Sequence, residues 1–71
     1  MKSNTKIINR LKRYRLLQGE LTQQDLAEKV GCSRQTIVLL EQERYVPSLA
    51  LAMRIARVFG APVDQVFTLA E

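Results

Sequence analysis

The 71-residue chain contains no histidine and only one cysteine, Cys32. One cysteine cannot form a disulfide within the chain, and together with the lack of histidine it leaves no zinc ligand set. Histidine is also the commonest general base, and Cys32 has no obvious activating base. We therefore expect no enzymatic activity, no metal and no cofactor. A lone cysteine is typical of a reducing compartment, which indicates a cytoplasmic protein.

Long apolar runs are missing as well. No stretch approaches the about 18 apolar residues of a membrane-spanning helix, and the N-terminus has no signal-peptide pattern, so we expect no membrane partner. A chain of 71 residues forms one domain with a small core. We expect a single domain over residues 1–71, with its core at about 6–69, held by helix packing and aided by dimerisation.

Acidic residues are absent before Glu20. Six basic residues precede position 16: Lys2, Lys6, Arg10, Lys12, Arg13 and Arg15. The remainder carries five basic and seven acidic residues, so the net charge of +4 understates the asymmetry. A basic end on a small domain suggests a polyanionic partner. A solvated basic helix that aids solubility gives the same pattern, so charge alone does not decide.

Apolar spacing and helix-end signals predict five helices around one core, an all-α fold. The first helix is expected over residues 6–18, with a buried stripe of Ile7, Ile8, Leu11 and Tyr14. The fourth is expected over about 49–59, where nearly every apolar side chain faces other helices. Pro62 at a first helical position opens a short last helix.

Residues 22–41 carry most of the functional information. Thr22 can cap one helix, with Asp25 completing a capping box. Gly31 ends that helix because the turn requires a positive φ, and Ser33 caps the next one. The apolar run 36–40 alone could also form a buried strand. Capping residues and the absence of a second strand pattern favour a helix.

This arrangement resembles the small regulators of the phage lambda repressor and Cro-like family, also called the Xre family. The resemblance covers residues 9–67. It is carried by Thr-Gln-Gln-Asp-Leu-Ala at 22–27, Gly-Cys-Ser-Arg-Gln-Thr-Ile at 31–37, the loop and helix from Arg44 to Gly60, and Val-Asp-Gln-Val-Phe at 63–67. One departure is Glu43, which stands where the family usually has glycine or a small residue.

The resemblance implies a compact five-helix, lambda-repressor-like DNA-binding domain with a helix-turn-helix. Its function would be sequence-specific binding of double-stranded DNA as a transcriptional regulator. Relatives usually act as repressors and as homodimers on palindromic operators. It also implies a structural ion pair between Arg15 and Glu41. We expect the dimer surface at Val66, Phe67 and Leu69.

Most of the expected DNA-binding residues lie on the second helix of the 22–41 segment, which begins after Ser33. Arginine can bond guanine and glutamine can bond adenine in a bidentate manner, so Arg34 and Gln35 are the candidate base readers. Ser33 and Thr36 lie beside them. These two residues could contact phosphate, or they could only cap the helix. Val38 and Leu39 could pack on thymine methyl groups or form a protein-contact patch, and Leu39 could instead partly join the core.

Phosphate contacts are expected around this helix. Gln23 begins a helix whose free backbone N–H groups favour an anion, and the family places a backbone contact there. The family also uses the following loop, here with Arg44 and Tyr45, to reach the sugar-phosphate backbone. Arg10 is a further candidate. Gln23 and Arg10 could instead be ordinary surface residues, and Tyr45 could instead pack over the loop.

Two other functions fit the same residues. A protein-interaction module, such as an antirepressor or an antitoxin component, would use Val38 and Leu39 against a protein partner. A non-specific DNA-coating protein would bind with a steep salt dependence and no preferred site.

Overall fold

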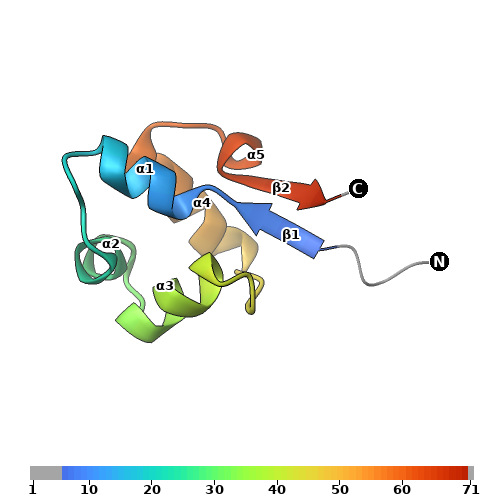
Figure 1. Ribbon diagram of the computed structural model, residues 1–71, viewed down its shortest axis with the longest axis horizontal. Coiled ribbons are helices and arrows are strands. Elements are labelled where there is room, and N and C mark those ends of the chain that lie inside the picture. Colours follow the sequence, from blue (N-terminus) through green and yellow to red (C-terminus); the bar gives the residue numbers. More distant parts are fainter. Residues whose placement is uncertain (1–5, 71) are drawn as a thin grey trace.

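The computed structural model describes residues 6–70, and five helices account for most of them. In chain order the elements are β1 (Lys6–Asn9), α1 (Leu11–Leu17), α2 (Gln23–Val30), α3 (Arg34–Glu41), α4 (Leu49–Phe59), α5 (Val63–Val66) and β2 (Phe67–Ala70). Figure 1 shows the helices gathered into one body, with the two strands side by side at one end. The expectation of a compact five-helix fold is confirmed.

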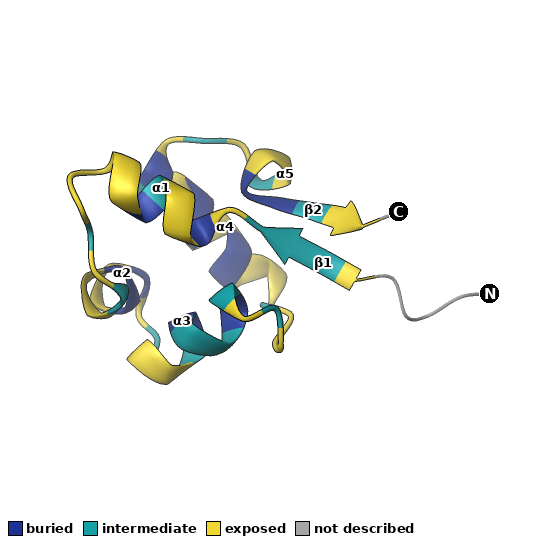
Figure 2. Cartoon of the chain, viewed as in Figure 1, coloured by how far each residue is buried: buried dark blue, intermediate teal, exposed yellow. Residues whose placement is uncertain are grey.

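The core receives side chains from every helix. Its largest fully buried members are Leu11, Leu26, Val30, Ile37, Leu40, Ile55 and Val66. Each buried Leu or Ile stabilises the fold by about 1.5–3 kcal/mol relative to exposure. Figure 2 shows buried positions on the inward faces of the helices and exposed positions outside. Tyr14 adds a stacked contact with Phe59, with ring centroids 5.2 Å apart.

The expected helix over residues 6–18 is wrong in its first third, because residues 6–9 form β1. This strand pairs antiparallel with β2, with Ile7 opposite Leu69 and Asn9 opposite Phe67. The Asn9 side chain separates strand from helix: its Oδ1 accepts from the backbone N–H of Leu11 (3.1 Å), and its Nδ2 donates to the carbonyl of Leu40 (2.6 Å). The expectation that the chain has no second strand pattern missed these two strands, which pair with each other, while residues 36–40 are helical as expected.

The C-terminal segment differs from expectation in the same region. Helix α5 begins at Val63 with Pro62 as its N-cap, and it ends where β2 begins. Val66 is fully buried and Phe67 is buried, both within the core. They cannot form the expected dimer surface, and of the three proposed residues only Leu69 is exposed.

Helix α4 has the expected bounds, with Ser48 accepting from the N–H of Leu51 and Gly60 ending the helix at a φ of 65°. Its apolar sector is narrower than the sequence indicated. Leu49 is 73% exposed and Met53 half exposed, so this part of α4 faces outward from the body. Within residues 6–70, no helix is long and apolar enough to cross a membrane.

Candidate nucleic-acid interface

The turn between α2 and α3 fixes how the two helices cross. Thr22 Oγ1 accepts from the N–H of Asp25 (3.0 Å), and the Asp25 carboxylate accepts from the N–H of Thr22 (3.1 Å), so the capping box is formed. Gly31 ends α2 at a φ of 77°, a conformation that glycine adopts without strain. Ala27 is fully buried in the core between the helices, where its small side chain permits close approach.

The start of α3 presents two uncommitted polar side chains. Ser33 Oγ accepts from the N–H of Thr36 (3.1 Å) and lies 2.9 Å from Thr36 Oγ1, so these hydroxyls serve the helix cap. Arg34 and Gln35 are exposed, and within residues 6–70 neither side chain has a hydrogen bond or ion pair. Their donors and acceptors are available to a ligand.

Farther along α3, one side is buried and the other is not. Ile37 and Leu40 are buried in the core, whereas Val38 and Leu39 are half-buried. The apolar surface that these two residues expose is therefore limited to part of each side chain. It adjoins the exposed turn that carries Arg34 and Gln35.

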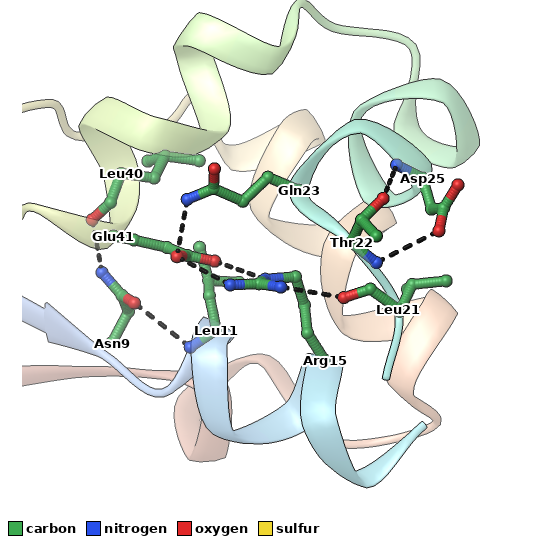
Figure 3. A network of polar contacts seen from close by, with 9 residues as sticks. All are labelled: Asn9, Leu11, Arg15, Leu21, Thr22, Gln23, Asp25, Leu40 and Glu41. Carbon is green, nitrogen blue, oxygen red and sulfur yellow. Dashed lines mark hydrogen bonds and ion pairs between the residues drawn. The ribbon is translucent and has the colours of Figure 1, made fainter. Parts of the chain in front are cut away.

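Gln23, at the start of α2, is held by a hydrogen bond that sequence reasoning missed. Its Nε2 donates to Glu41 Oε1 at 3.0 Å, which links the beginning of α2 to the end of α3 (Figure 3). One Nε2 hydrogen remains free. The capping box uses the N–H groups of Thr22 and Asp25 and leaves those of Gln23 and Gln24 available.

Arg15 and Glu41 form an ion pair between α1 and α3. Arg15 Nε donates to Glu41 Oε2 at 2.7 Å and Nη2 donates to Oε1 at 3.1 Å. Arg15 Nη1 also donates to the carbonyl of Leu21 at 2.8 Å. The two side chains are only 10% and 11% exposed. Figure 3 shows this network joining three segments: α1, the residues before α2, and α3.

The loop after α3 begins at Glu43, whose φ of 61° is left-handed. That conformation explains why a glycine suits this position. Glu43 Oε1 lies 3.2 Å from Lys6 Nζ, so the loop is tied to β1. Arg44 and Tyr45 follow and are exposed, as a contact to an external ligand requires.

Helix α1 forms one wall of a groove beside α3, whereas the sequence analysis named only Arg10 from this part of the chain as a candidate. A groove of about 830 Å³ lies between α1 and α3 and is lined by Asn9, Arg10, Lys12, Arg13, Leu16, Leu17, Gln23, Val38, Glu41 and Gln42. The excess of basic residues before Glu20 was the feature of the sequence that could have indicated this groove. Reading residues 6–18 as one uniform helix obscured which of them face α3.

Cys32 lies in the turn and packs partly against the core. Burial raises the pKa of its thiol above the ordinary value, and the Coulomb effect of Arg54 opposes this only in part. The thiol therefore remains protonated at neutral pH, as suits a packing residue. Within residues 6–70, no three potential metal ligands lie together.

Comparison with known proteins gives one consistent result. The family model described as helix-turn-helix matches residues 11–66. An uncharacterized HTH-type transcriptional regulator of Methanocaldococcus jannaschii is 52% identical over 83% of this chain and 88% of its own. Another from Archaeoglobus fulgidus is 50% identical over 82% of this chain and 81% of its own. The uncharacterized HTH-type transcriptional regulator YgzD of Bacillus subtilis is 41% identical over 89% of this chain and 94% of its own.

Proposed function

Because the chain belongs to the Xre/Cro-like helix-turn-helix family of DNA-binding transcriptional regulators, we propose that it is a sequence-specific repressor that binds a palindromic operator as a homodimer. The observation that carries this proposal is the start of α3. There Ser33 and Thr36 satisfy the helix cap, while Arg34 and Gln35 extend into solvent without a partner among the described residues.

Base reading is assigned to these two side chains. An α-helix fits the major groove of B-DNA, and recognition helices use residues near their N-terminus. Arg34 would bond guanine O6 and N7, and Gln35 would bond adenine N6 and N7. Val38 and Leu39, one turn farther, would contact thymine methyl groups with the apolar surface they leave exposed.

Phosphate contacts would fix the helix in the groove. At the start of α2, the free N–H groups and the second Nε2 hydrogen of Gln23 suit one phosphate. The hydrogen bond to Glu41 holds that amide in place before DNA arrives. On the other side of α3, Arg44 is exposed in a loop anchored by the Lys6–Glu43 ion pair. Ser33 and Thr36 would supply weaker contacts beside the bases.

A second copy of the chain would cover exposed apolar side chains, with Val46, Leu49, Met53 and Leu69, each half or more exposed, as the candidates. Leu69 lies on the same face of the two-stranded sheet as the buried Phe67, because the two positions are two residues apart on β2. The ion pair between Lys6 and Glu43 ties the loop before α4 to β1. Contiguous exposed apolar surface marks association sites. Two half-sites would then lie about 10–10.5 bp apart or at a multiple of that spacing.

The test is selection from random double-stranded DNA at about 150 mM salt, with the Arg34→Ala/Gln35→Ala variant in parallel. We expect a two-fold symmetric site that the variant no longer enriches. Arg57→Ala, a change at an exposed arginine on α4 outside the groove and the α3 surface, should enrich the same site as the wild type. A folded protein that enriches no site would refute sequence-specific binding and redirect the search to a protein partner of Val38 and Leu39.

Dimerisation and repression need separate measurements. Sedimentation equilibrium should give a dimer for the wild type and a monomer for Leu49→Lys/Leu69→Lys. A reporter placed downstream of the selected site should be expressed less when the protein is present. An enriched site without symmetry, or a reporter that rises, would contradict the homodimer or the repressor assignment respectively.

A further inference from the structure

We propose that the groove between α1 and α3 holds the DNA sugar-phosphate backbone, so that Lys12 and Arg13 are phosphate-binding residues outside the helix-turn-helix. This inference rests on the DNA-binding function proposed above. It extends the contact surface to a helix that the sequence motifs do not include. The groove has a volume of about 830 Å³ and runs along α1 toward the start of α2.

The first support is charge. Arg10, Lys12 and Arg13 all line the groove. Lys12 and Arg13 are exposed, and within residues 6–70 neither has an acidic partner at salt-bridge distance. Arg10 is tied elsewhere, because its Nη1 donates at 3.1 Å to the carbonyl of Gln65, which does not line this groove. Within the described part of the chain, Lys12 and Arg13 are therefore the free cations that border it.

The second support is the state of the acid in the same groove. Among the described lining residues only Glu41 is acidic. Its carboxylate already accepts two hydrogen bonds from Arg15 and one from Gln23. Arg15 neutralises it, so it does not cancel the charge of the α1 residues. The groove is thus complementary to a polyanion.

The third support is continuity with the proposed interface. Gln23 lines the groove and also begins α2, where a phosphate is expected. Val38 lines it from α3, and Gln42 follows at the end of that helix. A strand of backbone that meets the start of α2 while α3 lies in the major groove would therefore continue along α1. Leu16, also in the lining, offers an apolar surface to deoxyribose rings.

Salt dependence provides the test, because each phosphate contact lowers the slope of log K against log salt by about 0.9. We would measure binding by fluorescence anisotropy between about 50 and about 200 mM salt. The probes are a duplex that carries the selected site and a scrambled duplex of the same length. For Lys12→Ala/Arg13→Ala the slope should become shallower by about 1.8 on both duplexes. The wild type should then weaken about 12-fold more than the variant over this range.

Two further variants act as controls. Lys12→Arg/Arg13→Lys retains both charges and should retain the slope of the wild type. Arg57→Ala removes one exposed charge on α4, outside the groove, and should leave the slope unchanged. The preference for the selected over the scrambled duplex should be the same in all of these variants, since the lost contacts do not read bases.

The outcomes separate the two proposals. The groove assignment is overturned if Lys12→Ala/Arg13→Ala has the same salt slope as Arg57→Ala. The proposed function then still stands, provided that Arg34→Ala/Gln35→Ala loses the preference for the selected site. The groove assignment is also overturned if the charge-reversed pair Lys12→Glu/Arg13→Glu binds as tightly as the wild type. If the folded wild type binds neither duplex, both proposals fail together. Far-UV circular dichroism establishes that each variant is folded.

Discussion

Removal of Arg15 should destabilise this protein more than almost any other change to a charged residue. Its guanidinium makes two hydrogen bonds to Glu41 and one to the carbonyl of Leu21, and little of either charged side chain reaches solvent. Arg15→Ala leaves the Glu41 carboxylate with only the amide of Gln23 as its hydrogen-bond donor. The Leu21 carbonyl also loses its side-chain donor.

The magnitude follows from the burial of the pair. Breaking a buried ion pair by removing one partner costs about 3–5 kcal/mol. A domain of this length has a total stability of about 4–11 kcal/mol, so the loss is a large fraction of the whole. In a domain of this size each kcal/mol shifts Tm by about 4–8 °C. We therefore expect Tm to fall by at least about 12 °C.

Urea denaturation followed by circular dichroism measures this loss. Arg57→Ala, at an exposed residue, should change the free energy of unfolding by no more than about 0.5 kcal/mol. Arg15→Met/Glu41→Leu should be more stable than Arg15→Ala, because no buried charge is left without a partner. A loss below about 1 kcal/mol for Arg15→Ala, the range of solvent-screened pairs, would refute the reasoning.

Three further predictions concern α2 and the turn that follows it. Asp25→Asn should lower the urea midpoint at pH 7, because the charged carboxylate is stabilised in the folded protein. Its pKa lies below 3.8, mainly because of the hydrogen bond from the backbone N–H of Thr22 and secondly because of the hydrogen bond with the Thr22 side chain. This stabilisation is present above the unfolded pKa and is lost as pH falls through the lower folded pKa. The difference in urea midpoint between wild type and Asp25→Asn should therefore shrink below about pH 3.8. A difference that stays constant with pH would contradict this prediction. Cys32 should react with iodoacetamide more slowly in the folded protein than in urea, because burial raises its pKa; equal rates would show that folding neither covers the thiol nor raises its pKa. Gly31→Ala should cost about 1–2 kcal/mol by the same urea assay, purely through its positive φ, since an added Cβ meets no atom within 4 Å; an unchanged midpoint would contradict this.

Local signals were enough to predict most of the helical framework. The capping residues Thr22, Ser33 and Ser48 act within three residues of their own position, so their role is encoded in the adjacent sequence. Gly31 and Gly60 end their helices with positive φ in the same local way. These signals fixed the bounds of α2, α3 and α4.

The β-ribbon could not be predicted in this way because it depends on distant residues. Ile7 pairs with Leu69, at the opposite end of the chain, and apolar residues at 7 and 8 also fit the helical spacing that continues to Leu11. Asn9 lies at the point where the strand ends, and its Nδ2 donates to the carbonyl of Leu40. Only the tertiary fold brings those atoms together. The burial of Val66, at the end of α5, and of Phe67, at the start of β2, likewise depends on the tertiary fold.

The candidate site shows the same division. The exposure of Arg34 and Gln35 follows from helical periodicity and could be predicted, although their contacts with DNA stay a prediction. The hydrogen bond between Gln23 and Glu41 could not, because it joins two helices whose crossing is set by the turn. Nor could the groove, since it exists only where α1 faces α3.

The ion-pair network connects stability with the geometry of the proposed interface. Arg15 orients Glu41, and Glu41 holds the amide of Gln23 at the start of α2. If Arg15→Ala retains about 1 kcal/mol of stability, about five molecules are folded for each unfolded one. Unfolding then weakens apparent DNA affinity by only about 1.2-fold. Any larger loss, measured well below Tm, comes from molecules that are still folded, through misplaced phosphate donors and through the Glu41 charge that Arg15 no longer neutralises. Gln23→Ala should reproduce the part due to the misplaced donors without the large drop in Tm, because it leaves the Arg15–Glu41 pair intact.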